Sequence, residues 1–222
     1  MSVAAIRGVL SDPDRAGSLA DRTRRQRRAR LLAAFPDLQA MCVLDLGGTA
    51  GFWRHLGLYP QDLTLLNVTH HADPPTGRAL IGDACDPCSE ALDRPYDLVM
   101  CNSVIDQVGG LEQRKRLASV ITQTAPRYWV QTANRAFVFD AYFLFPGFPY
   151  LPVPARTWVL RHWRMTHMHT RDPVEAEARV RSIELQGRRD MRALFPDARV
   201  VTERFCGLPK SLIAVRGGPH LT

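Results

Sequence analysis

The sequence lacks an uninterrupted apolar run long enough to cross a bilayer. Its longest apolar stretch, residues 137–154, contains Asp140 and four prolines, so it does not form a clean membrane-spanning helix. The amino terminus also lacks the apolar core of a secretion signal, because Asp12, Asp14 and Arg15 come too early. We therefore expect a cytoplasmic protein without a membrane span.

Cysteine is too scarce for a disulfide framework or a zinc-binding scaffold. The five cysteines are an odd number, which indicates free thiols. The segment 85–88 is a lone C-x-x-C pair with two histidines nearby, whereas a structural zinc site normally needs two such pairs. Three further histidines are interpreted as surface residues: His162, His167 and His169. We expect no bound metal.

What is present is typical of one globular domain. The 222 residues can bury roughly 70% of the surface that the unfolded chain exposes. Hydrophobic residues make up 45% and charged residues 23%, which excludes disorder, collagen and coiled coil. The net charge is +7, and 27 of the 29 basic residues are arginine, so the balance permits an acidic partner.

Residues 1–40 are expected to form an amino-terminal helical segment, with Ser11 as a cap and Pro36 as the stop. The run 21–30 carries six arginines and one aspartate. We interpret it as a solvated helix face. The alternative is an electrostatic footprint for nucleic acid, although no aromatic residues are interleaved for base stacking.

Seven short apolar runs are predicted to be strands: residues 41–46, 63–68, 79–81, 96–101, 127–131, 199–205 and 211–215. Helical stretches separate most of them, for example 111–124 and 175–194. Such alternation predicts a doubly wound, Rossmann-like α/β fold whose sheet is covered on both faces. The short turn before the last strand makes that strand antiparallel, so the seven-stranded sheet is mixed.

An insertion interrupts this alternation after strand five. Residues 133–172 contain no clear strand, and residues 137–150 hold seven of the fourteen Phe and Tyr residues. A structureless block of this length in a compact domain is usually functional. We expect a wall or lid over the carboxyl edge of the sheet, with these substrate contacts: Phe137, Phe139, Tyr142 and Phe145.

The turn after the first strand indicates a ligand. Residues 45–51 read Asp-Leu-Gly-Gly-Thr-Ala-Gly, and glycines at a strand-to-helix turn allow close approach of a ligand. The G-x-G-x-x-G dinucleotide pattern and a phosphate-binding GKS or GKT loop are both absent. An acid before a glycine turn without a phosphate grip suits a ligand with a positive charge or an amino group.

Four landmarks follow in order: VLDLGGTAG at 43–51, Asn67 closing strand two, GDA at 82–84, and YDLVMCNSVIDQVG at 96–109. With this order and spacing the chain resembles the class I S-adenosylmethionine (SAM)-dependent methyltransferases. QTANR at 131–135 also looks like a segment that follows strand five in a subgroup of that family. The resemblance covers residues 41–135, and 198–216 by topology. It implies that SAM is the cofactor.

The resemblance assigns the cofactor to these residues: Asp45, Gly47, Gly48, Gly51, Asn67, Asp83, Ala84, Asn102 and Ser103. The turn at 45–51 would surround the methionine part, and Asp83 with the Ala84 backbone would meet the adenine. Asn102 and Ser103 would lie beneath the sulfonium. Relatives commonly close strand two with Asp or Glu to hold both ribose hydroxyls, whereas Asn67 accepts only through one amide oxygen.

We therefore predict one domain that transfers a methyl group to a small, largely apolar or aromatic acceptor. Its parts are the helices at 1–40, a SAM-binding half at 41–132, the insertion at 133–175, and a helix and hairpin at 176–222. The candidate bases are His71, Asp106 and Tyr142. Two alternatives stay open: an RNA or protein methyltransferase that docks through the arginine-rich helix, and a non-catalytic SAM-binding domain.

Overall fold

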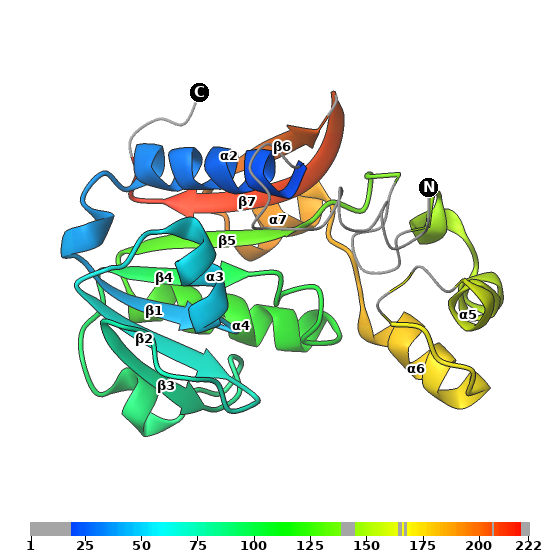
Figure 1. The fold of residues 1–222 in the computed structure, drawn as a ribbon, viewed down its shortest axis with the longest axis horizontal. Coiled ribbons are helices and arrows are strands. Elements are labelled where there is room, and N and C mark those ends of the chain that lie inside the picture. Colours follow the sequence, from blue (N-terminus) through cyan, green and yellow to red (C-terminus); the bar gives the residue numbers. More distant parts are fainter. Residues whose placement is uncertain (1–18, 139–144, 164–165, 167, 206, 219–222) are drawn as a thin grey trace.

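The computed structural model describes residues 19–138, 145–163, 166, 168–205 and 207–218 (Figure 1). The expected cap at Ser11 and two of the expected substrate contacts, Phe139 and Tyr142, lie outside this part of the chain. None of the described helices combines the length and apolarity needed to cross a membrane.

One seven-stranded sheet organises the molecule, in the order β3-β2-β1-β4-β5-β7-β6. The strands are β1 Cys42–Leu46, β2 Asp62–Asn67, β3 Gly77–Ile81, β4 Leu98–Asn102, β5 Arg127–Ala133, β6 Arg199–Phe205 and β7 Leu208–Arg216. β7 runs antiparallel to both of its neighbours, and β1 to β5 pair in parallel. The predicted mixed sheet with an antiparallel last strand is confirmed. The carboxyl ends of the parallel strands lie on the right in Figure 1.

Helices cover both faces of the sheet. They are α2 Leu19–Ala34, α3 Ala50–Leu56, α4 Leu111–Thr124, α5 Val153–His162, α6 Pro173–Ser182 and α7 Arg188–Leu194, with short 3₁₀ helices η1 Leu38–Ala40, η2 Ser89–Leu92 and η3 Phe148–Tyr150. α2 and α3 pack on one face and α4 and α7 on the other, while α5 and α6 stand apart beyond the carboxyl edge (Figure 1).

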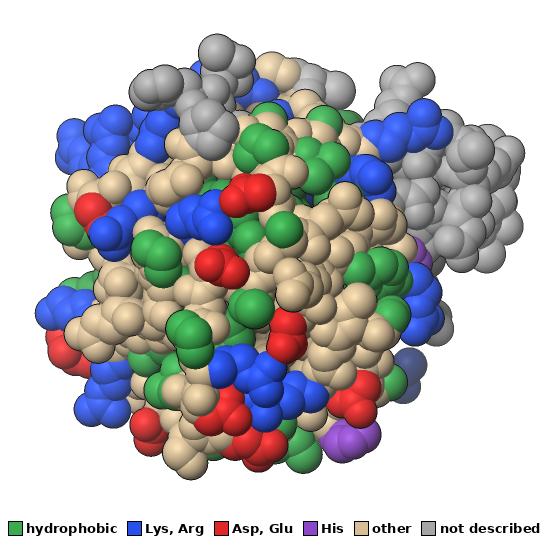
Figure 2. All heavy atoms as spheres, turned by 90° about the vertical axis from the view of Figure 1, so that its left-hand side faces the viewer, with side chains coloured by type: hydrophobic (Ala, Val, Ile, Leu, Met, Phe, Trp, Pro, Cys, Tyr) green, Lys and Arg blue, Asp and Glu red, His purple; other side chains and the backbone are tan. Residues whose placement is uncertain are grey.

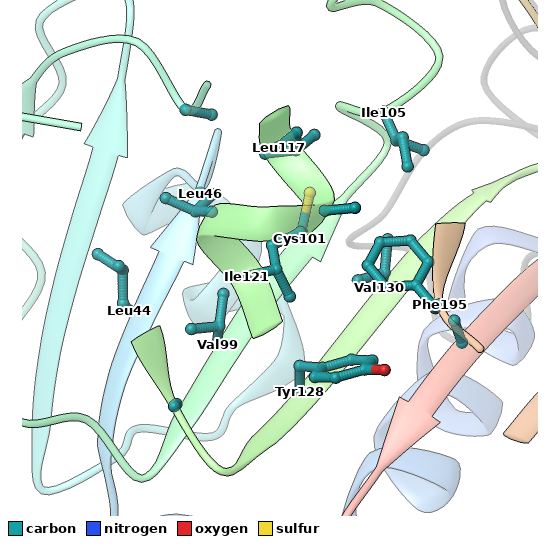
Figure 3. Packing of buried hydrophobic residues seen from close by; sticks show 14 of the residues in the cluster. Leu44, Leu46, Val99, Cys101, Ile105, Leu117, Ile121, Tyr128, Val130 and Phe195 are labelled. Atoms are coloured by element: carbon teal, nitrogen blue, oxygen red, sulfur yellow. The ribbon is translucent and has the colours of Figure 1, made fainter. Parts of the chain in front are cut away.

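The face under α4 and α7 is filled by aliphatic side chains and a few rings. Leu117 and Ile121 of α4 lie over the buried residues of β1, β4 and β5 (Figure 3). The rings of Tyr128 and Phe195 lie 5.5 Å apart between their centroids, which fixes α7 to β5. Each fully buried side chain of this size contributes roughly 1.5–3 kcal/mol, so this layer holds the strand ends in place.

The opposite face is built around two buried tryptophans. Trp53 of α3 and Trp129 of β5 are 0% and 1% exposed, and Phe35 packs edge-on against Trp129 with centroids 6.4 Å apart. Some arginines of the arginine-rich run of α2 point toward the protein on this side. Arg28 donates to the carbonyl oxygens of Leu56 and Gly57, at 2.8 and 2.7 Å, and so satisfies the end of α3.

Two expectations for the second half of the chain are wrong. The helix expected over 175–194 is two helices, because residues 183–187 leave helical geometry and Gln186 bridges to Asn134. The insertion is not structureless, since it contains η3 and α5. A small hydrophobic cluster of its own, centred on Phe148, Leu160 and Val180, joins α5 to α6.

The side of the molecule at the amino ends of the strands has a mixed surface. Figure 2 shows basic and acidic side chains interspersed there, with scattered hydrophobic ones. Arg78 and Asp93 form one such pair at 2.7 Å. Among the described residues, this face therefore has no continuous basic stripe of the kind that binds a polyanion.

Candidate functional site

A cleft of 440 Å³ lies at the carboxyl edge of the sheet, where β1, β2, β3 and β4 end. Its lining residues are Gly47, Leu66, Asn67, Val68, Gly82, Asp83, Ala84, Cys85, Ser103, Val104, Gln107, Val108 and Gln113. Ligands of open α/β sheets bind in this position. The structure thus brings together five of the nine predicted cofactor residues, from four separate segments of the chain.

The glycine turn is shaped by its neighbours on both sides. Gly47 has φ +74°, and a Cβ there would lie 2.2 Å from Val104 Cγ2, so only glycine fits. Thr49 caps α3 by accepting a hydrogen bond from the Phe52 N–H at 3.3 Å. A Cβ added at Gly51 would have one described heavy atom within 4 Å, Thr49 Oγ1 at 3.8 Å, which leaves this side of the turn open.

Asn67 ties the end of β2 to this turn. Its side-chain Nδ2 donates to the carbonyl oxygens of Gly47 and Gly48, at 3.1 and 3.2 Å. The amide oxygen is therefore the only acceptor that the side chain offers to a ligand. A carboxylate at this position could make neither of the two hydrogen bonds to the turn, which gives a physical reason for asparagine here.

The segment after β3 forms a second wall of the cleft. The exposed Asp83 accepts from the Cys85 N–H at 2.8 Å, and Gly82 N donates to Asn67 O at 2.9 Å. Cys85 also lines the cleft. The pKa of its thiol is raised to about 11, mainly because the thiol is partly buried and also because the charge of Asp83 is close. That thiol is protonated at neutral pH and is a poor nucleophile or metal ligand.

The end of β4 carries backbone strain. Ser103 has φ 60°, in the left-handed region that non-glycine residues rarely adopt. The strained turn is held by Ser103 N, which donates to Gln131 O at 2.8 Å, and by the side chain of Gln107, which donates to Ser103 O. Such strain clusters at functional sites, and it places Ser103 in the cleft wall.

Asp45 lies beneath the turn and not in the cleft lining. It is 1% exposed, and its Oδ2 accepts from Trp53 Nε1 at 2.8 Å. Burial raises the pKa of Asp45 to about 7, and the Trp53 hydrogen bond offsets this only in part. Its Oδ1 has no hydrogen-bond partner in the described part of the chain.

No protein-family model and no curated protein sequence matches this chain. Solved structures do. N-methyltransferase NodS from Bradyrhizobium japonicum WM9 is 14% identical, with TM-score 0.53 over 91% of this chain and 100% of that one. Magnesium protoporphyrin IX methyltransferase (ChlM) from Synechocystis PCC 6803, solved with bound SAM, is 14% identical, with TM-score 0.50 over 88% of this chain and 79% of that one. The chain has the class I SAM-dependent methyltransferase fold.

The same fold occurs in a nucleic-acid enzyme. The small RNA methyltransferase HEN1 is 14% identical to this chain, with TM-score 0.54 over 89% of this chain and 25% of that one. Similarity at this level establishes the methyltransferase fold and leaves the acceptor open.

Within this methyltransferase fold, the candidate bases do not converge on the cleft. His71 pairs with Thr69 Oγ1 at 3.1 Å, outside the cleft lining. Asp106 is 0% exposed, and its backbone oxygen accepts from Glu184 N at 2.8 Å. Tyr142 lies outside the described residues. Asp83 and Cys85 are the only titratable side chains among the described lining residues.

Two aromatics of the insertion, Phe145 and Phe148, pack within the cluster of α5 and α6. Phe145 meets Trp163 edge-on, with centroids 5.3 Å apart, and Phe148 is 1% exposed in the cluster of α5 and α6. Phe137 is half-buried directly after β5, and its N–H donates to Asn134 O at 2.9 Å. None of these three rings is among the lining residues of the cleft.

A continuous polar row on the sheet was not predicted from the sequence. Every strand except β3 places one polar side chain near the carboxyl edge on the face of α2 and α3, each two residues from a core residue of that face. The polar row consists of Asn67, Asp45, Asn102, Gln131, Ser211 and Glu203. One sign of it was present in the sequence of β6, where Glu203 is two residues from Val201 and so points to the same, core-facing side of the strand. The strand register, which places Asn102 opposite Gln131 and Glu203 opposite Ser211, is invisible in sequence.

Proposed function

We propose that this chain is a SAM-dependent methyltransferase acting on a small acceptor. The observation that carries the proposal is the cleft, whose walls are the glycine turn, Asn67, the segment 82–85 and Ser103. These are the segments that the family resemblance assigned to SAM. The position at the carboxyl edge and the shared fold support the same ligand.

Unpaired polar atoms beside the cleft fit the amino-acid part of SAM. Asp45 Oδ1 and Asn102 Oδ1 are buried acceptors that lack a hydrogen-bond donor among the described residues. Asp45 is the last residue but one of β1 and Asn102 the last of the neighbouring β4, and both lie on the same face of the sheet. A buried acceptor without a donor is costly, so an ammonium group reaching these oxygens would be stabilised. The open side of Gly51 leaves room for such a ligand to approach.

Bound SAM supplies a methyl group on a sulfonium, which is a good leaving group. The residues of this chain then need to position the acceptor about 3 Å from that carbon and exclude water. The absence of a convergent base among the described lining residues suits an acceptor atom that needs no deprotonation before attack. Ser103, held in its strained turn, gives this wall of the cleft a fixed position.

A small acceptor is favoured over RNA by the arginine-rich helix itself. Arg28 is used to satisfy the end of α3, and Arg30 pairs with Glu203 at 2.5 Å. Arg27 lies over the Phe52 ring at 5.8 Å. The protein thus engages Arg28 and Arg30, and Arg27 is half-buried, so these side chains do not form an exposed docking surface for a polyanion.

The test is the structure of the protein with S-adenosylhomocysteine (SAH), together with turnover of SAM to SAH. We expect the adenine beside Asp83 and Ala84 and the sulfur above Ser103. Absence of SAH from this cleft would contradict the cofactor assignment. SAH bound there without any turnover across a broad acceptor panel would instead favour a non-catalytic SAM-binding domain.

A further inference from the structure

The end of the polar row holds a buried carboxylate that is already fully paired. Glu203 is 2% exposed, and its Oε1 accepts from Arg30 Nη1 at 2.5 Å. Its Oε2 accepts from Gln131 Nε2 at 3.2 Å and from the Ser211 hydroxyl. Both oxygens are used, and one guanidinium balances the charge.

Two more cations gather around this carboxylate without pairing with it. Arg27 lies one helical turn before Arg30 on α2, and Lys210 directly precedes Ser211 on β7, whose hydroxyl contacts Glu203. The charge of Glu203 acts to raise the pKa of both cations, and neither forms an ion pair with a described residue. The Nε of Arg27 is buried without a partner in the described part of the chain. Burial lowers the pKa of both side chains, and Arg27 and Arg30 further lower the pKa of Lys210. Three cations thus surround one carboxylate.

Arg27 and Lys210 are both half-buried, and excess positive charge that is partly shielded from water is unfavourable unless an anion completes it. Neither side chain has a counter-ion of its own here that offsets the water it loses. The aromatic rings under Arg27 and Lys210, Phe52 and Phe205 at 5.8 Å each, compensate weakly. The arrangement is that of an anion site.

The site adjoins the cleft. Gln131 of the polar row accepts through its backbone from Ser103 N at 2.8 Å, and Ser103 lines the cleft. Phe52, which lies under Arg27, directly follows Gly51 of the glycine turn. β7 is two strands from β4, and strands lie about 4.8 Å apart, so Lys210 of β7 stands roughly 10 Å from the end of β4.

We propose that Arg27 and Lys210 bind an acidic group, a carboxylate or a phosphate, of the methyl acceptor. The acceptor is then a small organic anion whose reactive atom lies over β4 and whose acid lies roughly 10 Å away. Arg27 supplies a planar fork for the acid and Lys210 a point charge. Glu203 is a positioning residue that holds Arg30 and Gln131. This inference rests on the proposed methyl transfer.

Binding is tested with inorganic phosphate as the probe, titrated into SAH-saturated protein by calorimetry. We expect one phosphate per chain, and at least a tenfold weaker affinity in both Arg27→Met and Lys210→Met, which keep the length of the side chain. Arg54→Met, which removes an exposed charge from α3, should stay within twofold of the wild type. Absence of phosphate binding to the wild type, or equal loss in all three variants, would overturn the proposal.

The methionine carboxylate of SAM is another source of the same anion. SAH carries that carboxylate and 5′-methylthioadenosine does not, so both are titrated into wild type and Arg27→Met. We expect the variant to bind both nucleosides like the wild type. Selective loss of SAH affinity would assign the anion to SAM and overturn the acceptor inference. If the wild type binds phosphate but neither nucleoside, it is the proposed function that fails.

Substrate preference gives the final arm of the test. Hydroxy- and amino-aromatic acids are compared with their primary amides by SAH formation. We expect the acids to have at least tenfold higher kcat/KM, and Arg27→Met to remove that preference through KM. Equal turnover of acids and amides, or a preference that survives in Arg27→Met, would overturn the proposal.

Discussion

Asn67 holds the glycine turn from below by donating its side-chain amide to the carbonyl oxygens of Gly47 and Gly48. The relatives' carboxylate at the end of strand two would suggest that Asn67→Asp tightens SAM binding. The geometry predicts the reverse. A carboxylate loses both hydrogen bonds, worth about 1 kcal/mol each, and places its charge against two carbonyl oxygens.

We therefore expect Asn67→Asp to weaken SAH binding by about tenfold or more, measured by calorimetry, and to lower the melting temperature. Asn67→Ala is the control, since it removes the donor without adding charge, and should lie between wild type and Asn67→Asp. Tighter SAH binding by Asn67→Asp would show that the side chain serves the ribose and not the turn.

Asp45 gives a pH-dependent prediction. Its carboxyl has a pKa of about 7 in the folded protein, against an ordinary value of 3.8. Between these values the folded state keeps a proton that the unfolded state loses, so stability falls as pH rises, by roughly 4 kcal/mol in all. Asp45→Asn retains an acceptor for Trp53 and has no charge to bury.

Asp45→Asn should thus match the wild type near pH 4 and exceed it in unfolding free energy at pH 8, with denaturant titrations as the measurement. The exposed Asp86→Asn is the control and should run parallel to the wild type. A constant difference between Asp45→Asn and wild type from pH 4 to pH 8 would show that Asp45 ionises freely in the folded protein.

Much of the methyltransferase fold was readable from the sequence, because the buried strands are continuous apolar runs and the glycine turn is local. What sequence could not supply is pairing between distant segments. β3 begins at Gly77, earlier than expected, because Gly77 pairs with Leu63 of β2. The two backbones are so close that a Cβ at Gly77 would lie 2.0 Å from Leu63 O. The break between α6 and α7 depends on the Asn134–Gln186 bridge, which joins residues far apart in the chain.

The sequence motifs predicted residues that line the cleft, but they did not predict side-chain pairs between segments far apart in the chain. Gly47, Asn67, Asp83, Ala84 and Ser103 line one cleft, as residues at strand ends do. The Glu203 pairing with Arg30, in contrast, needs the register of an edge strand and the rotation of a helix. Neither can be obtained from spacing alone.

The insertion gives a prediction about stability. Phe145 packs edge-on against Trp163, so Phe145→Ala should destabilise the cluster of α5 and α6 by about 2–3 kcal/mol, below the 3–5 kcal/mol typical of a fully buried ring. Hydrogen exchange of the α5 and α6 amides should accelerate, while SAH affinity stays within twofold. Tyr150→Ala, at 63% exposure, should change neither. Slower turnover with unchanged exchange in Phe145→Ala would make Phe145 a substrate contact.

A substitution in the arginine-rich helix α2 distinguishes a structural role of its arginines from a role in nucleic-acid binding. Arg28→Met removes two charge-assisted hydrogen bonds to the end of α3, so it should lower the unfolding free energy by about 2 kcal/mol. Its affinity for a single-stranded RNA oligomer, measured by fluorescence anisotropy at several salt concentrations, should equal that of the wild type. A tenfold loss of RNA affinity with unchanged stability would favour an RNA acceptor.

Binding of SAH to Gly51→Leu tests the central claim most directly. Apart from its chain neighbours and its own helix backbone, a Cβ at Gly51 would meet only Thr49 Oγ1 within 4 Å, at 3.8 Å, so a side chain can start here without a clash. We expect leucine to preserve the fold, because it has a higher helix propensity than glycine. By calorimetry, the wild type should bind one SAH per chain. Gly51→Leu, with an unchanged or raised melting temperature, should bind none. Equal SAH binding by both proteins, or none by the wild type, would contradict a SAM site at this turn.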